Sequence, residues 1–194
     1  MMSAGKKTLI LASESPRRRE LLRNLGAEFS CISAGVEEYS EDSVPERLPE
    51  KNALLKAEAV AEKFPDSFVL GADTGVFYGG RMFGKPADTA QAEKMLSILS
   101  GKTHQVITGV ALICRSRKIL HCWSTVSDVA FGVLSAEDIR NYISQVHVLD
   151  KAGAYGIQEH PEMLKASWTG ELENIIGLPL LELKEVLEKY ALLQ

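Results

Sequence analysis

The chain of 194 residues has few of the residues that build disulfide bonds and histidine metal sites. Its three cysteines, Cys31, Cys114 and Cys122, show no C-x-x-C spacing, which favours reduced thiols over disulfides or a zinc knuckle. The four histidines form no i,i+4 pair, so a histidine metal site is not expected. No apolar run approaches the about 20 residues that span a bilayer, and the short apolar run that follows residues 1–7 is too brief for a signal-peptide core. We expect a cytoplasmic protein that makes no contact with membranes.

The motifs of several large enzyme classes are also missing. The sequence has no Gly-x-x-x-x-Gly-Lys-Ser/Thr loop, no Gly-x-Gly-x-x-Gly, no Gly-x-Ser-x-Gly and no His-Glu-x-x-His. These absences argue against a P-loop nucleotidase, a dinucleotide-binding Rossmann enzyme, an α/β-hydrolase and a zinc protease. The formal net charge of −4 gives no general attraction to nucleic acid or to anionic lipid. With 45% hydrophobic residues, residues 1–194 are expected to form one globular domain.

The stretch from Leu9 to Leu22 organises the chain, because an apolar run turns through a polar corner into a helix. Ser15 suits the N-cap and Pro16 suits the first helical position. Arg17, Arg18 and Arg19 follow in the first turn, where the helix dipole disfavours each cation by ~0.3–1 kcal/mol unless an anion binds. Helical spacing predicts that the first two arginines meet a ligand and that the third meets water. A solvated basic turn is the other interpretation.

Acidic residues follow two of the expected strands. Asp73 and Thr74 come after the apolar run 68–72, and ligands of open α/β sheets collect at the carboxyl ends of strands. A turn-forming aspartate is the alternative. Glu37 and Glu38 follow the short strand 29–33 and form either a metal site or a solvated acidic loop.

Three further residues have both a structural and a functional interpretation. Lys56 lies at the edge of the apolar stripe of an alanine-rich helix over 49–63, and either extends to solvent or leans into a cleft. Lys85 stands between a glycine and a proline, which present it rigidly. Gln158 ends the glycine-rich run 150–158, which is a tight loop or a pocket wall. Its amide can both donate and accept, as reading a base edge requires.

The remaining pattern alternates helices with strands. Further helices are expected after Asp88 or Thr89 and after Ser135 with an Asp138 capping box, and a closing helix is expected to start at residues 177–180. The Gly-Gly pair at 79–80 predicts a hairpin over 76–83, and residues 109–114 and 119–133 are predicted to form a long antiparallel pair of strands. The expected core stripe of the 49–63 helix is Ala53, Ala57, Val60 and Phe64.

Six short motifs, in this order along the chain, carry a resemblance to a known family. They are Ser13-x-Ser15-Pro16-Arg17-Arg18, Gly71-Ala72-Asp73-Thr74, Lys85-Pro86, Ser100-Gly101-x-Thr103-His104-x-Val106, Asp150-Lys151-Ala152-Gly153-Ala154-Tyr155-Gly156-Ile157-Gln158 and Gly177-Leu178-Pro179-Leu180. The chain resembles, over almost its whole length, the Maf family of nucleoside triphosphate pyrophosphatases.

The resemblance implies an α/β fold related to inosine triphosphatase, with an elongated mixed sheet flanked by helices and two lobes around a deep cleft. It implies hydrolysis of a nucleoside triphosphate to the monophosphate and pyrophosphate with Mg²⁺ or Mn²⁺. By this resemblance, Asp73 matches the catalytic base of the family. Three further residues match positions linked to substrate choice: Arg17, Thr74 and Gln158. Glu38, Lys56 and Lys85 match positions that line the cleft, and the motif from Ser13 to Arg18 belongs to the substrate site.

On this basis we expect Glu38 and Asp73 to hold the divalent cation through hard oxygen ligands. The four cations Arg17, Arg18, Lys56 and Lys85 would neutralise the triphosphate, while Thr74 and Gln158 would read the pyrimidine edge. The Ala154-Tyr155 pair is similar to the branch of the family that acts on dTTP and UTP rather than on 7-methyl-GTP. Gly75, in place of a valine or isoleucine, and Glu159, in place of a glycine, depart from the family pattern next to the expected pocket.

Two other function classes remain open. The chain could regulate septum formation by binding nucleotides without turnover, or bind nucleic acid through Arg17 to Arg19 and Arg115 to Lys118, which the acidic net charge disfavours. Release of orthophosphate would indicate a γ-phosphatase. Family members are often homodimers, so pairing with a second copy is left open, with the apolar hairpin 77–83 as an interface or as core.

Overall fold

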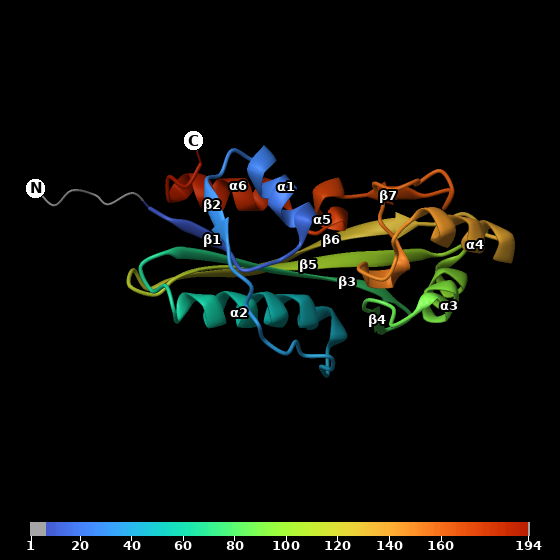
Figure 1. Ribbon diagram of the computed structural model, residues 1–194, viewed down its shortest axis with the longest axis horizontal. Helices are drawn as coiled ribbons and strands as arrows, with labels where there is room; N and C mark the ends of the chain where they lie inside the picture. Colours follow the sequence, from blue (N-terminus) through green and yellow to red (C-terminus); the bar gives the residue numbers. More distant parts are fainter. Residues whose placement is uncertain (1–6, 194) are drawn as a thin grey trace, which may run out of the picture.

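A computed structural model describes residues 7–193 of the chain. One seven-stranded mixed sheet runs along the long axis of the molecule, with strand order β2-β1-β3-β5-β6-β7 and with β4 paired to β3 (Figure 1). The strands are β1 (Leu9–Leu11), β2 (Phe29–Cys31), β3 (Phe68–Tyr78), β4 (Arg81–Phe83), β5 (Thr103–Cys114), β6 (Ile119–Ala130) and β7 (Ser167–Thr169). The predicted elongated mixed sheet flanked by helices is confirmed.

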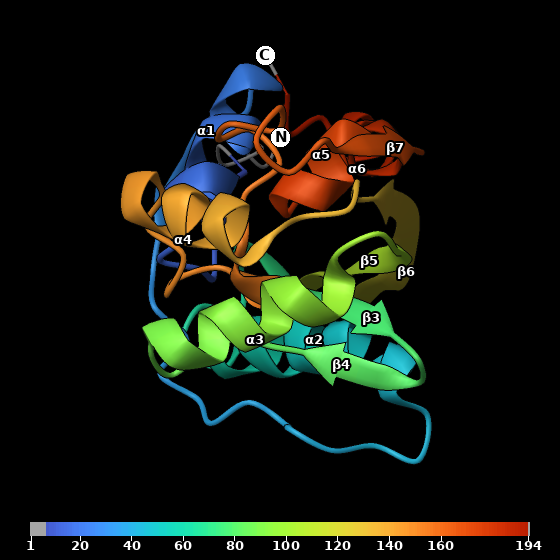
Figure 2. The same cartoon turned by 90° about the vertical axis from the view of Figure 1, so that its right-hand side faces the viewer.

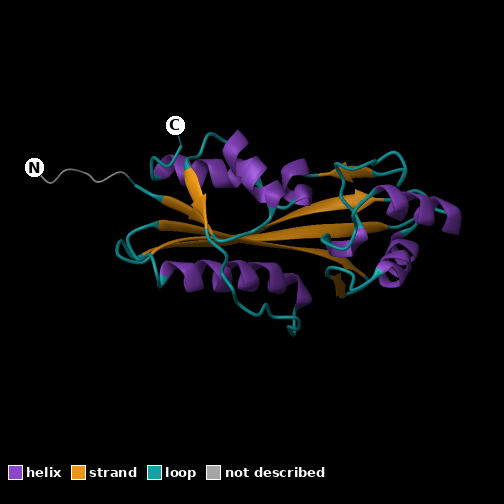
Figure 3. Ribbon diagram, viewed as in Figure 1, coloured by secondary structure: helices purple, strands orange, loops and turns teal. Residues whose placement is uncertain are grey.

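Helices cover both faces of the sheet (Figure 3). They are α1 (Pro16–Asn24), α2 (Leu48–Ala61), α3 (Thr89–Leu99), α4 (Ala136–Gln145), α5 (Leu172–Ile176) and α6 (Leu180–Lys189), with short 3-10 turns at Pro45–Arg47 and Ala152–Ala154. Within residues 7–193, no helix has the length and apolar character that crossing a bilayer requires.

The predicted helix caps are present. The Ser15 side chain accepts a hydrogen bond from the backbone N–H of Arg18 and Pro16 is the first residue of α1. Gly26 follows the helix with φ +86°, which a residue without a Cβ adopts at little cost. At α4, Ser135 and Asp138 form the reciprocal capping box.

At one end of the sheet, two apolar clusters cover opposite faces. Leu21 and Leu22 of α1 and Leu183 and Leu187 of α6 pack on one face, and α2 packs on the other. The α2 helix lies very close to the sheet because two glycines of the sheet, Gly71 in β3 and Gly109 in β5, face it. A Cβ built on Gly71 would lie 2.2 Å from the carbonyl oxygen of Ala53.

A third cluster forms the other end of the molecule, where α3 and α4 meet the far ends of β3, β5 and β6 (Figure 2). Tyr142 and Leu96 are fully buried there, and His104 is enclosed between the rings of Phe131 and Tyr155. The separate clusters at the two ends of the long sheet correspond to the two expected lobes.

Among the described residues, no strand pairs with the middle of β3 on one of its sides, which leaves a free edge between these ends. On that side, β1 pairs only with Phe68–Leu70 and β4 only with Val76–Tyr78. On its other side, antiparallel β5 pairs with β3 from Val69 to Phe77. Asp73 therefore lies inside β3, and the prediction that it ends the strand is wrong. The antiparallel β5 partner extends β3 by several residues, and the opening is at the end of the short strand β1.

The Gly79–Gly80 hairpin is confirmed, with both glycines at positive φ. One side chain expected in the core is exposed instead, because Phe64 follows the end of α2 and is 39% exposed. Cys31 lies exposed at the end of β2. The three cysteines are free thiols, as predicted.

Candidate active site

A cavity of about 710 Å³ opens at the free edge of β3, between the two ends of the molecule. Its walls come from the β1–α1 corner, the loop after β2, the α2 helix, the Gly84–Lys85 loop and the 150–158 segment. All nine residues singled out in the sequence line it: Ser13, Arg17, Arg18, Glu38, Lys56, Asp73, Thr74, Lys85 and Gln158. Groups up to 145 positions apart in the chain thus share one cavity.

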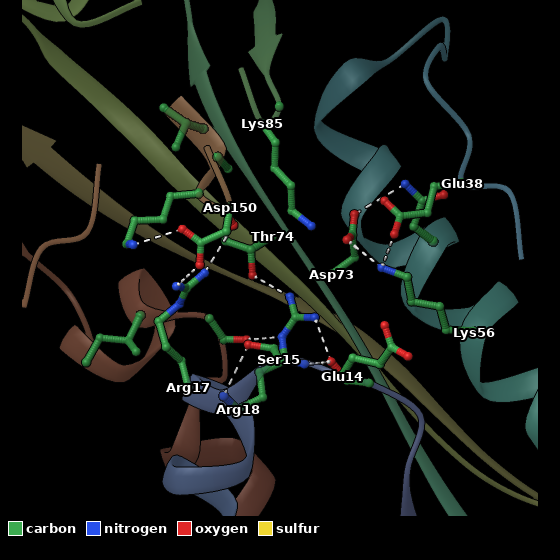
Figure 4. Close-up of a pocket in the computed structure, with 18 of the residues that line it drawn as sticks. Glu14, Ser15, Arg17, Arg18, Glu38, Lys56, Asp73, Thr74, Lys85 and Asp150 are labelled. Carbon is green, nitrogen blue, oxygen red and sulfur yellow. Dashed lines mark hydrogen bonds and ion pairs between the residues drawn. The ribbon is translucent and has the colours of Figure 1, made fainter. Parts of the chain in front are cut away.

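The alternation of side chains along β3 separates two halves of this site. Val69 and Asp73 face α2, whereas Leu70, Ala72 and Thr74 face α1. One strand therefore presents an acid to one wall of the cavity and a hydroxyl to the other. Figure 4 shows Asp73 and Thr74 diverging in this way, toward Lys56 and Arg18 respectively.

Lys56 of α2 lies between the two predicted carboxylates. Its ammonium Nζ is 2.8 Å from Oδ1 of Asp73 and 2.7 Å from Oε1 of Glu38 (Figure 4). The Lys56 residue is only 9% exposed, so the side chain leans into the cleft rather than extending to bulk solvent. Both carboxylates are therefore brought to one point by the same cation.

Asn52, one turn before Lys56 on α2, also binds Asp73. Its Nδ2 donates to Oδ2 of Asp73 at 3.2 Å and to the carbonyl of Tyr39 at 3.1 Å, while its Oδ1 accepts from the N–H of Tyr39. This fully buried amide fixes the loop that carries Glu38 against the helix and orients the aspartate. The sequence interpretation missed it, although its spacing of four from Lys56 places both on one helix face.

The side chains of Arg17 and Arg18, both in the first turn of α1, bind different partners. Arg17 donates from Nη1 to Oδ2 of Asp150 at 2.8 Å, and Lys151 binds the other oxygen of the same carboxylate at 2.9 Å. Arg18 donates from Nε to the carbonyl of Gly177 at 2.8 Å and from Nη2 to Oγ1 of Thr74 at 3.0 Å. Asp150 was in a recognised motif, but its role as the partner of Arg17 was not anticipated.

The charges of the cavity shift the pKa values of its groups. Burial acts to raise the pKa of Glu38, but the hydrogen bond from Lys56 and the nearby cations outweigh it, and the pKa lies below its usual value. Burial lowers the pKa of the Arg18 guanidinium, against the opposing charges of Asp73 and Glu38. Burial also acts to raise the pKa of Asp150, but the hydrogen bonds from Lys151 and Arg17 outweigh it, and the pKa lies below its usual value. Both carboxylates are therefore ionised at neutral pH.

Lys85 and Gln158 lie at the exposed part of the wall, and neither forms a hydrogen bond or ion pair with another residue in the range 7–193. Their polar groups are thus available to a ligand. Arg19, expected in water, lies outside the cavity lining but is half-buried, with Nη2 bonded to the carbonyl of Glu14.

The two departures from the family pattern lie beside this wall. At Gly75, the side chains of Phe77 and Met82 occupy the space that a Cβ would enter. Glu159 forms an ion pair with Lys151 at 3.1 Å. Its carboxylate and that of Asp150 therefore both bind the same lysine, which also lines the cavity.

The donor set suits a hard divalent cation. Glu38 and Asp73 present carboxylate oxygens that converge on one atom, the Nζ of Lys56, and one Glu38 oxygen has no protein partner in the described chain. Among residues 7–193, no cluster of three or more acidic, histidine or cysteine side chains exists that would enclose a metal. Two carboxylates leave most of the six or more oxygen ligands to waters or to phosphate. The two carboxylates would thus anchor a cation that also binds water or phosphate oxygens.

Comparison with known proteins agrees with this architecture. The chain is 47% identical to a dTTP/UTP pyrophosphatase of Akkermansia muciniphila, over 92% of this chain and 94% of the relative. It is also 47% identical to a dTTP/UTP pyrophosphatase of Symbiobacterium thermophilum, over 94% and 93% of the two chains. The solved structure of the Staphylococcus aureus Ham1 protein superimposes with a TM-score of 0.55 at 17% identity, covering 95% of this chain and all of that one.

A Coxiella burnetii HAM1 structure matches at a TM-score of 0.53 and 16% identity, over 94% of this chain and 99% of that one. At such identities, these two likenesses show the fold alone. The family model described as "Maf-like protein" matches residues 8–190, which include every element of the sheet and every residue of the cavity. The chain belongs to the Maf family.

Proposed function

We propose that this protein is a nucleoside triphosphate pyrophosphatase that hydrolyses dTTP or UTP to the monophosphate and pyrophosphate, a house-cleaning type of activity. The observation that carries the proposal is that two converging carboxylates, Glu38 and Asp73, face a set of cations across one cavity. The names of the relatives support the pyrimidine substrates. The chain is proposed to act as one bilobed domain over residues 1–194, in the cytoplasm, where its free thiols stay reduced.

The triphosphate would bind along the basic wall. The first turn of α1 presents backbone N–H groups and a positive dipole end, and Arg17 and Arg18 add planar donors that match phosphate oxygens. Lys85 approaches from the opposite loop with its ammonium free of protein partners in the described chain. Thr74 and Gln158 would contact the nucleoside, because both line the cavity beside this wall.

The acidic wall would carry the chemistry. Glu38 and Asp73 would hold Mg²⁺ or Mn²⁺, which supplies charge neutralisation and lowers the pKa of a bound water. Asp73 accepts the proton of the water that attacks the α-phosphorus. The new bond joins the water oxygen to that phosphorus, the α–β anhydride bond breaks, and pyrophosphate leaves. Asn52 and Lys56 keep the Asp73 carboxylate oriented for this step.

The test is incubation with dTTP, UTP, 7-methyl-GTP and ATP in the presence of Mg²⁺, with separate detection of pyrophosphate and orthophosphate. We expect pyrophosphate, released fastest from dTTP or UTP. Asp73→Asn should lower turnover at least ~10²-fold with an unchanged circular dichroism spectrum, whereas Asp128→Asn, exposed on β6, should not. Orthophosphate release, or nucleotide binding without turnover as in a septum regulator, would contradict the proposal. Near-normal turnover of Asp73→Asn would remove Asp73 from the role of the base.

We also propose that two copies pair along the outer edge of β6. Among the described residues, no strand pairs with this edge before Asp128, and Leu120 and Val126 are 59% and 48% exposed. The segment 119–127 contains none of the lysine or proline residues that usually protect an edge. Antiparallel pairing about a twofold axis at Trp123 would place Lys118 of each copy opposite Asp128 of the other.

The hairpin 77–83 is a weaker candidate, because Phe77 is only 4% exposed and its apolar neighbours pack against the core. Light scattering after size exclusion should give twice the chain mass, and Val126→Lys should return it to the chain mass. A dimer that Val126→Lys leaves intact would refute the β6 interface, and a monomeric wild-type protein would refute the pairing itself.

A further inference from the structure

Behind the cavity wall, Thr74 begins a series of hydrogen-bonded side chains whose buried members the proposed reaction does not itself use. Thr74 of β3 and Thr108 of β5 are register partners, and their Oγ1 atoms are 2.9 Å apart. Thr108 is fully buried and also bonds the backbone carbonyl of Asn174 in α5 at 2.9 Å. At the other end, the Thr74 oxygen meets Nη2 of Arg18 at 3.0 Å.

The groups at the two ends of this series of hydrogen bonds determine which group donates at each step. A guanidinium can only donate hydrogen bonds, and a carbonyl oxygen can only accept them. Each of the two threonines between them has a single hydroxyl hydrogen. Only one arrangement satisfies all three contacts: Arg18 donates to Thr74, Thr74 donates to Thr108, and Thr108 donates to the carbonyl of Asn174.

The far end is anchored in the core. The Nδ2 of Asn174 donates to the carbonyl of Val106 at 3.1 Å and to Oγ of Ser127 at 2.9 Å, and that hydroxyl donates in turn to the carbonyl of Glu171. Asn174 is fully buried, and its Oδ1 has no partner in the described chain, which is costly. A costly buried amide is thus used to tie α5 to β5 and β6.

The same segment also holds the other side of Arg18, because the carbonyl of Gly177 accepts from Nε. A third donor, Nη1, lies 3.5 Å from Oγ of Ser13. Of the five N–H donors of the guanidinium, two remain free to face the cavity. The orientation of these two depends on Thr74, and through it on Thr108.

We infer that Thr108 is a positioning residue, whose hydroxyl fixes the guanidinium of Arg18 for the triphosphate and commits Thr74 to be only an acceptor toward the nucleotide. The inference rests on the proposed function for the identity of the ligand. Because Thr74 has given its one hydrogen to Thr108, the nucleotide group that it meets is an O–H or N–H donor. A phosphate oxygen, which only accepts, is excluded from that contact.

The test compares Thr108→Val, which keeps the shape but removes the hydroxyl, with Thr108→Ser, which keeps the hydroxyl. Affinity is measured by calorimetry with Mg²⁺ and a UTP analogue whose α–β bridging oxygen is replaced by a methylene group, and KM and kcat are measured with UTP. We expect Thr108→Val to raise Kd and KM about 5–10-fold, the loss of one net hydrogen bond, with kcat within about twofold. Thr108→Ser should restore both constants.

A matched control separates positioning from loss of stability. Val129→Ala removes fully buried apolar volume on β6 without touching the hydroxyl chain, so it should destabilise the fold and leave Kd unchanged. The double variant Thr74→Val/Thr108→Val should bind the UTP analogue no more weakly than Thr74→Val alone, because both changes interrupt the same series of hydrogen bonds. Should Thr108→Val not fold, Ser127→Ala removes one of the two hydrogen bonds that anchor Asn174 and should raise Kd by about two- to fourfold.

The outcomes distinguish this inference from the proposed function. Turnover of UTP with unaltered Kd and KM in Thr108→Val, an equal loss of affinity in Val129→Ala, or no rescue by serine would overturn the positioning role and leave the activity intact. Analogue binding that weakens as expected, in a protein without pyrophosphatase activity, would overturn the activity and keep the positioning role. A wild-type protein that binds neither nucleotide would overturn both.

Discussion

Replacing Lys56 by methionine tests the arrangement of the acidic wall directly. The substitution keeps most of the apolar stem and removes the ammonium that binds Asp73 at 2.8 Å and Glu38 at 2.7 Å. The Lys56 and Asp73 side chains are only 11% and 13% exposed, so the aspartate would lose a cation in a poorly hydrated place. Glu38 is half-exposed and would contribute little.

The expected loss of stability follows from these exposures. Breaking a buried ion pair costs about 3–5 kcal/mol. Asn52 still binds Oδ2 of Asp73, and the pair borders an open cavity, so we expect about 2–3 kcal/mol for Lys56→Met at neutral pH. The control Lys63→Met changes an exposed lysine just after the same helix and should stay within about 0.5 kcal/mol of wild type.

The pH dependence adds a smaller part to this prediction. The Glu38 pKa is held below its ordinary value of 4.5 in the folded protein, so its contribution is present above that pH and is lost as the pH falls through the folded pKa. Because the half-exposed Glu38 supplies only a small part of the loss, urea unfolding followed by tryptophan fluorescence should show a difference between wild type and Lys56→Met that is slightly smaller at pH 4 than at pH 7.5. A variant as stable as wild type at pH 7.5, or a difference that grows as the pH falls, would refute the reasoning.

Two further predictions concern the scaffold. A Cβ at Gly109 would lie 2.3 Å from the backbone of Pro49 and Glu50, so Gly109→Ala should lower the free energy of unfolding by at least about 3 kcal/mol. The control Gly84→Ala, whose added Cβ would have nothing within 4 Å, should leave this free energy nearly unchanged. Equal urea midpoints for the two variants would contradict the close packing of α2 on the sheet. Burial lowers the pKa of His104 to about 4 from 6.5, so the unfolded chain takes up a proton first and stability should fall by up to about 3 kcal/mol between pH 7 and pH 4. His104→Gln should remove that part of the slope in urea titrations, and an unaltered slope would show that His104 is not its source.

Local chemistry in the sequence was sufficient to predict several elements. Ser15 and Pro16 begin a helix, Gly79 and Gly80 close a hairpin, and Ser135 with Asp138 caps another helix. Each of these depends on groups within four residues of one another, so the signal can be found in the local sequence. The identity of the cavity residues came instead from the ordered motifs of a family resemblance.

The position of Asp73 within its strand could not be obtained in this way. The apolar run before it reads as a strand that ends at the acid, but the twelve-residue strand β5 pairs across it and continues to Phe77. A distant partner thus decided where the strand ends, and the short length of β1 decided that the acid lies at an open edge.

By itself the sequence determined the capped helices, the tight turns and the free thiols, because these depend on bonds between neighbouring residues or on residue type alone. Only the tertiary structure decided that Lys56 joins Glu38 to Asp73, that Asp150 holds Arg17, and that Thr108 and Asn174 support Arg18. These contacts join segments 17 to 133 residues apart, whose pairing is set by strand register and by the packing of α2 and α5 on the sheet. Sequence spacing does not encode such distances, because the contacts exist only once the sheet has formed.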